Sequence, residues 1–420
     1  MFVGAFLSKW VNVRPHEVKI LLWAWLYVFV LFVAYYVLRP IRDELGVTGG
    51  VGDLPWLFTG TLIAMLILSP IYGYLVNHWD RERFIAIAYR FFMAHLLIFM
   101  MFMYGATGEI LAWTGRLFFI WVSVFNLFVV SVFWSLMSDV FDTEQGKRLF
   151  GVLATGATLG GIIGSAFVAG FADVFSQYVL LFMAVVLLEV AVQSAKHISR
   201  LSTPHQADTP NNASPVVKDS IWSGLQRTFS SPYLLGISAF ILLYSITSTV
   251  LYFQQAQIVG NHFESREART AFFAQIDLWV NGLTLLFQLG LTGRMMKYLG
   301  IIPVLAILPL FSVISFALLA LYPTVIVFVI VQVARRVSNF AFARPSREVL
   351  FTRLSREDRY KAKNVIDTVV YRTGDQLGSW GYAGLSAMSL SLSAISWVAV
   401  PVCMVWFVLA VWLAGQEKPT

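Results

Sequence analysis

Long apolar runs alternate with short polar segments along the chain, and each run has the length of a membrane-spanning helix. About twenty apolar residues in a helix cross the roughly 30 Å hydrocarbon core of a bilayer. Twelve such runs can be read near residues 20–38, 55–76, 84–104, 117–138, 149–172, 178–196, 233–256, 271–292, 301–321, 324–343, 365–388 and 393–414. The pattern predicts an all-α polytopic membrane protein with twelve transmembrane helices.

A polar stretch after the sixth run divides this pattern in two. Residues 198–230 contain Ser202-Thr203-Pro204 and the run from Pro210 to Pro215, which are rich in loop formers. We therefore expect an N-terminal six-helix half at 1–197, a cytoplasmic linker at 198–230 and a C-terminal six-helix half at 231–420.

Composition supports lipid as the solvent of this protein. Of its 420 residues, 58% are hydrophobic and 13% are charged, with a mean hydropathy of +0.73. The net charge of +7 does not require a nucleic-acid partner, because lysine and arginine also accumulate in the cytoplasmic loops of membrane proteins. The single cysteine, Cys403, excludes an internal disulfide framework.

The basic residues also predict the orientation. With an even number of spans and both termini in the cytoplasm, most lysines and arginines fall in cytoplasmic segments. The loops expected outside hold only Arg39, Arg42, Arg116, Arg266 and Arg269. The first nineteen residues show neither a cleavable signal nor a plastid transit peptide, which favours a bacterial cytoplasmic membrane.

Two short loops form a weak internal repeat. The segment from Gly73 to Arg83 follows the second span, and the segment from Gly293 to Gly300 follows the eighth. Each places a glycine at a helix end before basic residues, and both resemble degraded copies of the loop signature of the major facilitator superfamily. Asn77 and Lys297 stand where that signature has an acidic residue. The resemblance implies two six-helix halves related by a repeat.

The fifth span contains glycines at a four-residue spacing, Gly156, Gly160 and Gly164. Such a face has no side chains and lets a neighbouring helix approach closely. We expect helix packing, with a hinge like that of antiporters in the superfamily as the alternative.

Charged side chains inside the spans are the strongest functional signal, because each costs several kcal/mol in hydrocarbon unless it meets water or a partner. More of them are basic than acidic, and arginine binds carboxylate or phosphate through paired hydrogen bonds. We therefore expect an anionic substrate. The candidate binding residues are Arg39, Arg42, Arg90, Arg335 and Arg372, with Tyr36 placed to stack a ring.

Acidic residues in the spans would balance charge or couple protons. Asp277 is the leading candidate for proton coupling, and an ion pair with one of the arginines is an equal alternative. Asp375 is a second candidate. We expect Glu189 to pair with Lys196 or to reach the interface. No GxxxxGK[ST] loop is present and no histidines are paired at ligand spacing, so we expect gradient-driven transport or exchange without metal or cofactor.

Three segments resemble the ATP/ADP translocase family of intracellular bacteria and plastids. They are Tyr35-Tyr-Val-Leu-Arg-Pro-Ile-Arg-Asp-Glu44, Phe133-Trp-Ser-Leu-Met-Ser-Asp139 with Lys147-Arg-Leu-Phe-Gly151, and Arg344-Pro-Ser-Arg-Glu348 with Lys361-Ala-Lys-Asn-Val-Ile-Asp367 and Arg372-Thr-Gly374. These motifs are collinear but cover about a sixth of the chain. The resemblance implies nucleotide exchange on a twelve-span scaffold.

By that resemblance, Arg42 matches a required basic residue at the end of the first span. Asp139 matches an acidic position that ends the fourth span, and Asp367 with Arg372 matches a charged pair in the eleventh. Two departures matter: Pro40 replaces an acidic residue, and Asp375 stands where nucleotide exchangers carry a lysine. The lost cation weakens the case for a triphosphate.

We therefore expect a monomeric secondary transporter that moves an anionic solute, with nucleotides as one candidate, by alternating access. The alternatives are a proton-coupled transporter of another organic anion or amphiphile and a non-transporting sensor on a transporter scaffold. In the sensor, the basic segment Arg344–Lys363 would bind a partner. As a positive-inside loop, it would contact anionic lipid instead.

Overall fold

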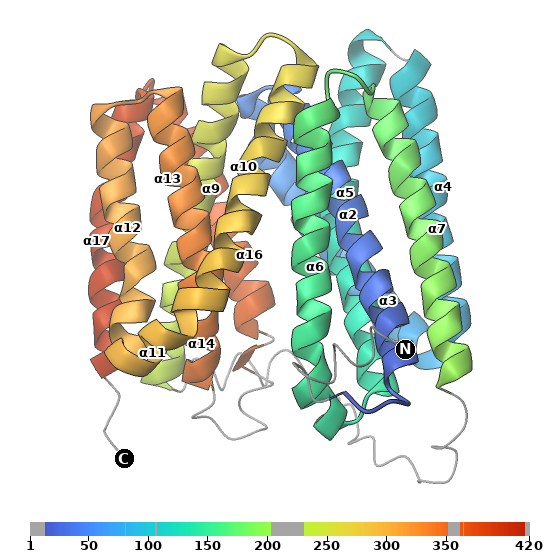
Figure 1. The fold of residues 1–420 in the computed structure, drawn as a ribbon. Coiled ribbons are helices and arrows are strands. Elements are labelled where there is room, and N and C mark those ends of the chain that lie inside the picture. The colour runs from blue at the N-terminus through green and yellow to red at the C-terminus, as the bar shows by residue number, and fades with distance from the viewer. Residues whose placement is uncertain are drawn as a thin grey trace. The chain divides into compact units, whose positions relative to one another are not determined.

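The computed structural model describes residues 13–79, 81–105, 107–202, 231–351, 362–363 and 365–415 (Figure 1). Within these ranges every regular element is a helix, which confirms the all-α fold class. The elements are α2 (Val18–Thr48), η1 (Val51–Asp53), α3 (Leu54–His78), α4 (Arg81–Gly105), α5 (Gly108–Val140), α6 (Thr143–Phe171), α7 (Gln177–Leu201), α9 (Pro232–His262), α10 (Arg266–Phe287), η2 (Gln288–Thr292), α11 (Gly293–Leu299), α12 (Ile301–Leu321), α13 (Val325–Val337), η3 (Ser338–Ala343), α14 (Arg344–Phe351), η4 (Ile366–Val370), α16 (Tyr371–Ala387) and α17 (Leu392–Gly415).

Eleven helices in the described part of the chain are long and apolar enough to cross a membrane. Each corresponds to one of the expected spans. The remaining expected span, 365–388, is helical through η4 and α16, but it is not among the eleven. Asp367, Arg372 and Asp375 lie within it, so its polarity sets it apart from the others. A count of twelve spans stays a prediction.

The first spanning helix is longer than the hydropathy pattern indicates. The apolar run ends near residue 38, whereas α2 continues to Thr48 with Pro40 inside it. The added turns contain Arg39, Arg42, Asp43 and Glu44, whose charges are compensated by ion pairs. Hydropathy cannot detect this extension because the compensating partners lie far away in the sequence.

The chain forms two compact units. Unit 1 comprises residues 1–49, 60–211 and 264–278, and unit 2 comprises residues 50–59, 212–263 and 279–420. The first turns of α10 thus belong to unit 1, and the first turns of α3 belong to unit 2. Residues 203–230, most of the expected linker, lie outside the described residues, so the division into halves at 197 and 231 stays a prediction.

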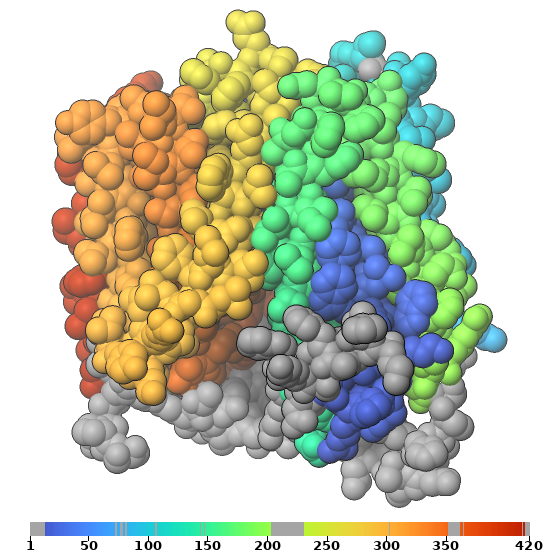
Figure 2. Space-filling view, in the orientation of Figure 1, coloured from blue at the N-terminus to red at the C-terminus, as the bar shows by residue number. Residues whose placement is uncertain are grey.

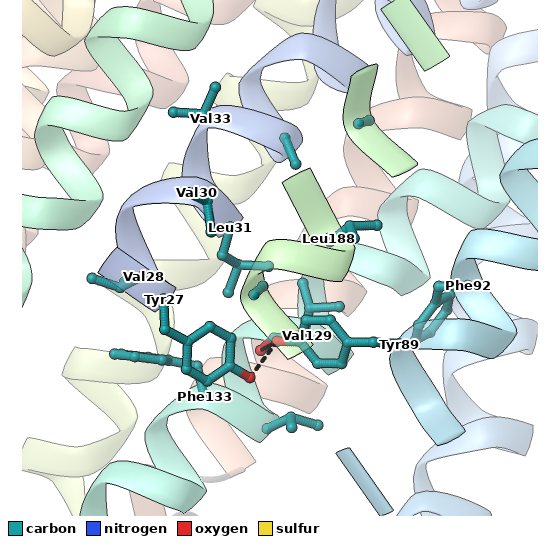
Figure 3. Packing of buried hydrophobic residues seen from close by; sticks show 14 of the residues in the cluster. Tyr27, Val28, Val30, Leu31, Val33, Tyr89, Phe92, Val129, Phe133 and Leu188 are labelled. Carbon is teal, nitrogen blue, oxygen red and sulfur yellow. Dashed lines mark hydrogen bonds between the residues drawn. The ribbon is translucent and has the colours of Figure 1, made fainter. Parts of the chain in front are cut away.

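Unit 1 is built around α2, which contacts α5, α6 and α7. In its core the Tyr27 hydroxyl donates to the Tyr89 hydroxyl at 2.7 Å, and Tyr89 donates to the Val129 carbonyl at 3.1 Å (Figure 3). Phe133 meets the Tyr27 ring edge-on at 5.1 Å. Three helices, α2, α4 and α5, are therefore joined by a buried hydrogen-bonded chain set in apolar packing.

The glycines of α6 allow a close approach to α2. A Cβ atom on Gly160 would lie 2.5 Å from the Phe29 carbonyl oxygen, and one on Gly164 would lie 2.8 Å from the Val33 carbonyl oxygen. Both obstacles are backbone atoms that cannot rotate away. The packing interpretation of this glycine face is confirmed.

Unit 2 packs α12 against α17 and α9 against both α16 and α17. Gly374 and Gly378 of α16 face α9, where added Cβ atoms would lie 2.6 Å from Ser245 Cβ and 2.9 Å from the Ile246 carbonyl oxygen. Three π-helical segments, η2, η3 and η4, interrupt the helices of this unit. Among the described residues, π-helical segments occur in unit 2 alone.

Candidate functional site: charged side chains in the spanning helices

The C-terminal part of α2 carries a cluster of ion pairs. Arg39 Nη1 lies 3.1 Å from Asp277 Oδ1 of α10, and Arg42 Nη2 lies 2.6 Å from Asp43 Oδ1. The Asp277 side chain is 2% exposed. Of the two interpretations open for Asp277, the structure confirms the ion pair with an arginine. Tyr36 is buried beside this cluster, and the Arg39 guanidinium lies 5.8 Å from its ring centroid.

Glu44 is the centre of a second buried network one turn further along α2. Its side chain is fully buried, and its oxygens accept hydrogen bonds from Arg266 at 3.2 Å and Arg269 at 3.1 Å. Gln177 of α7 donates at 3.0 Å, and the Thr48 hydroxyl donates as well. One carboxylate therefore holds the first turn of α10, 222 residues away, against α2.

Asp375 of α16 is held from two helices. It accepts hydrogen bonds from Ser245 at 2.6 Å and Thr249 at 3.2 Å, both on α9. Arg372, one turn before it on α16, pairs with its other oxygen at 3.1 Å. Asp375 is 6% exposed, so this is a buried carboxylate with one cation and two hydroxyls around it.

Arg335 of α13 lies inside unit 2 among neutral groups. Its side chain is 3% exposed. Its nitrogens donate to Ser312 Oγ at 3.0 Å, Ser248 Oγ at 2.9 Å, Thr247 Oγ1 at 2.6 Å and the Tyr244 carbonyl at 3.4 Å. In the part of the chain that the structure describes, no carboxylate lies within ion-pair distance of it. Its charge is solvated by hydroxyl and carbonyl dipoles, and its guanidinium lies 5.6 Å from the ring centroid of Tyr244 and 6.0 Å from that of Trp406.

The remaining predicted residues have other surroundings. Arg90 of α4 pairs with Glu189 of α7 at 3.0 Å, and both side chains are partly exposed. Glu189 thus pairs with Arg90, whereas the sequence suggested a pair with Lys196 or a position at the interface. Asp367 pairs with Arg347 of α14 at 3.3 Å, and Arg372 pairs with Asp375, so the pairing of Asp367 with Arg372 that the resemblance suggested is not the one in the structure.

Asp139 is exposed near the end of α5. Within the described residues, no three His, Cys, Asp or Glu side chains gather in a group that could hold a metal ion.

Sequence reasoning missed several residues that hold these clusters. Glu44 stands in a quoted motif but was not singled out, and Arg266 and Arg269 were assigned only to an outer loop. Ser245 and Thr249 lie in the apolar run of α9 at a four-residue spacing, and hydroxyls so placed indicate hydrogen bonds to another helix. That spacing was the one usable signal.

A further buried carboxylate, Glu17, lies just before α2. It accepts from Arg148 at 2.9 Å, Gln145 at 3.1 Å and the Arg14 backbone N–H at 2.8 Å. Burial raises the pKa of the Glu17 carboxyl, but these hydrogen bonds outweigh burial and lower the pKa from 4.5 to about 2. The contact joins the beginning of α2 to the beginning of α6.

Two groups of known proteins resemble the chain along its length. ADP,ATP carrier protein 1 of Chlamydia pneumoniae is 21% identical over an alignment of 481 positions, gaps included, which covers 97% of this chain and 92% of the relative. ADP,ATP carrier protein 2 of the same organism is 21% identical over 480 such positions, covering 93% and 88%. The resemblance first seen in three motifs is thus confirmed at low identity over the whole chain.

Solved structures share the fold. A bacterial homologue of the iron transporter ferroportin in an inward-facing state has a TM-score of 0.68 at 12% identity, covering 94% of this chain and 99% of that one. The nucleoside transporter NupG has a TM-score of 0.62 at 15% identity, covering 97% and 100%. The model of the Major Facilitator Superfamily matches residues 20–359. The protein is a multi-pass membrane transporter, and the chain belongs to the major facilitator superfamily.

Proposed function

We propose that the protein is a secondary transporter of an anionic solute and that nucleotides are the leading candidates. The observation that carries this proposal is Arg335, a buried cation surrounded by neutral hydrogen-bond acceptors. Removing a charge from water costs several kcal/mol, and neutral dipoles offset only part of that cost. An anion that replaces these hydroxyls would be attracted to the Arg335 charge, which no carboxylate among the described residues neutralises.

The named relatives support nucleotides as the anion. The ADP,ATP carriers of Chlamydia pneumoniae match 97% and 93% of this chain, and nucleotides combine phosphate oxygens with a planar base. Arginine forks would bind the phosphates. In this proposal Arg335 and Arg372, both in unit 2, bind the solute. Binding by Arg39 and Arg42 and stacking of a base on Tyr36 stay predictions from sequence. Asp277 and Asp375 balance the charge of the arginines, while Arg90, Asp139 and Asp367 stay predictions from sequence.

We propose alternating access as the mechanism, with the Glu44 network as a contact that fixes the beginning of α10. Arg266 and Arg269 reach Glu44 from α10, a helix of the C-terminal half of the sequence, whereas Glu44 lies on the first helix of the N-terminal half. If both termini are cytoplasmic, this network lies on the outer side. Both partners belong to unit 1, so the network ties the first turns of α10 to α2 within that unit.

We propose the cytoplasmic membrane of a bacterium as the location and a single chain as the functional unit. The distribution of basic residues supports cytoplasmic termini. Cysteine labelling from outside intact cells tests this: a cysteine at Val174, 70% exposed between α6 and α7, would be labelled, and one in the segment 203–215 would not. The reverse pattern rejects the orientation.

A second candidate function is proton-coupled uptake of another organic anion, and Asp375 favours it. This buried carboxylate lies between Arg372 and two hydroxyls of α9, and protonation would release Arg372 for a substrate. An imposed pH gradient would then drive uptake, and Asp375→Asn would abolish the drive. Exchange that ignores the pH gradient would favour the nucleotide antiporter instead.

The test is exchange by purified protein in liposomes loaded with ADP and given labelled ATP outside. The proposal predicts uptake of label that depends on internal ADP and is lost in Arg335→Gln. Arg116→Gln is a matched control, because Arg116 lies over the Trp113 ring at 4.7 Å near the beginning of α5. Uptake of a different anion without ATP exchange would reject nucleotides but retain the transporter. Failure to move any anion would favour the sensor.

A further inference from the structure

An apolar groove of about 640 Å³ runs along the surface of unit 2 between α10, α11, α12 and α13. Figure 2 views the molecule from a side on which these helices reach the surface. Trp279, Phe287, Leu291 and Met295 form one wall, and Ile330 and Phe342 lie on the other. The lining hydroxyl of Ser338 already donates to the Ala334 carbonyl at 2.7 Å. The groove therefore offers a ligand apolar contact and almost no hydrogen bonding.

Two π-helical segments form part of the walls. Leu291 lies in η2 and Phe342 lies in η3. Gln288 Nε2 donates to the Phe340 carbonyl at 3.1 Å, which ties the two segments together. A π-helical turn interrupts the regular helix and is frequent at functional sites. The groove is thus bounded by two π-helical segments, and a hydrogen bond from the Gln288 side chain to the Phe340 carbonyl connects them.

Basic residues lie at one end of the groove. Arg294 and Lys297 flank Met295 on α11, and both are exposed. Within the ranges that the structure describes, neither side chain has a carboxylate partner. Tyr298 next to them is 76% exposed, and Lys297 Nζ lies 5.6 Å from its ring centroid. Aromatic and basic side chains together are typical of the membrane interface.

The dimensions suit one lipid chain. Sixteen residues separate Trp279 from Met295, which corresponds to about 24 Å of helix at about 1.5 Å per residue. Half of the hydrocarbon core is about 15 Å deep. A chain that starts at the basic end can therefore lie along the groove over the full depth of one leaflet.

We propose that this groove binds an anionic phospholipid, with one acyl chain along the wall from Met295 to Trp279 and the phosphate on Arg294 and Lys297. Water gains too few hydrogen bonds to fill an apolar groove. The anionic solute proposed above would find no donor inside it. A lipid fits both parts, because its tail matches the apolar lining and its phosphate matches the two cations. This inference is independent of the transported substrate.

The test uses the full-length protein in mixed micelles with phospholipids whose acyl chains carry bromine, which quenches tryptophan. Brominated phosphatidylglycerol is compared with brominated phosphatidylcholine, and subtracting the signal of Trp279→Phe isolates Trp279. We expect half-maximal quenching of Trp279 at a roughly tenfold lower fraction of phosphatidylglycerol. The double variant Arg294→Gln/Lys297→Gln removes this preference.

Two controls separate the groove from the general lipid surface. Lys196→Gln/Arg200→Gln removes two basic residues near the end of α7 in unit 1 and leaves the preference unchanged. Ala334→Phe fills the groove and reduces quenching by both lipids, whereas Val405→Phe on the exposed face of α17 does not. Equal quenching by the two lipids in the unaltered chain, or a preference that survives loss of Arg294 and Lys297, overturns the proposal.

Discussion

Two helices are each divided between the two units, so that their first turns belong to one unit and their remaining turns to the other. Ion pairs hold the first turns of one helix, and neutral contacts hold those of the other. Residues 264–278, the first turns of α10, belong to unit 1, where buried ion pairs join them to α2. Residues 50–59, with the first turn of α3, belong to unit 2. There the Trp380 indole donates to the Thr59 hydroxyl at 3.2 Å, and Trp56 meets the Trp380 ring edge-on at 4.9 Å.

These segments open the second and eighth expected spans, which correspond in a six-plus-six repeat. Both segments are divided in this way from the rest of their helix, whereas the chemistry that holds each of them differs. Breaking a buried ion pair costs about 3–5 kcal/mol, but losing a neutral hydrogen bond costs about 1 kcal/mol. The contact between α2 and α10 should therefore contribute more electrostatic free energy to stability than the contact that holds residues 50–59.

The largest effect is expected for Glu44→Ala. This change leaves Arg266 and Arg269 without their common acceptor, and we expect a loss of about 3–5 kcal/mol in stability. Thermal unfolding in detergent measures it. Glu109→Ala, an exposed acid at the beginning of α5, should be near neutral. A Glu44→Ala protein as stable as the Glu109→Ala protein would show that the network contributes nothing.

A double-mutant cycle on Arg39 and Asp277 measures the free energy of a second ion pair between α2 and α10. We expect a coupling free energy of about 1–3 kcal/mol between Arg39→Gln and Asp277→Asn, because their side chains lie 3.1 Å apart and are largely buried. The cycle is measured by unfolding of all four proteins. Additive effects of the two changes would contradict the ion pair.

Loss of the neutral contact between Thr59 and Trp380 should lower the free energy of unfolding by less. Thr59→Val removes the acceptor of the Trp380 indole and the hydroxyl that donates to Gln376 at 2.9 Å, and we expect a loss of about 0.5–1.5 kcal/mol for each of these neutral hydrogen bonds. Thr158→Val is a matched control, since that hydroxyl donates to the Ala154 carbonyl of its own helix. If Thr59→Val destabilises the protein as much as Glu44→Ala does, the contrast between the two segments is wrong.

The last prediction concerns the dependence of stability on pH, through Glu17 at the other end of α2. Its pKa is lowered to about 2, so its contribution is fully present above 4.5 and is lost as the pH falls from 4.5 towards 2. Thermal stability of the unaltered chain should fall through that window more than that of Glu17→Gln. Equal pH dependence in the two proteins would show that Glu17 is not the responsible group.

Hydropathy predicted eleven of the spans because a bilayer forces backbone groups into helices of nearly fixed length. It also placed within the expected spans two charges that the structure buries, Arg335 and Asp375. It could not choose between the two roles open for Asp277, because Arg39 lies 238 positions away and only packing brings them together.

Other features had no usable sequence signal. The π-helical segments depend on local packing, and the assignment of residues 50–59 and 264–278 to units depends on tertiary contacts. Glu44 lies beyond the expected end of the first span at residue 38, but its partners bring it fully inside. Charge near a helix end therefore indicates an interface only when no distant partner neutralises it.

The most direct test of an anion transporter with Arg335 at its centre is ligand-dependent stability of the purified protein. A panel of ADP, ATP and organic acids is compared on the unaltered chain and on Arg335→Gln. A ligand at a hundred times its Kd stabilises the native state by about 2.7 kcal/mol. We predict that at least one anion, with ADP and ATP first, raises the Tm of the unaltered chain and not that of Arg335→Gln. Equal stabilisation of both proteins, or none by any anion, would contradict the account.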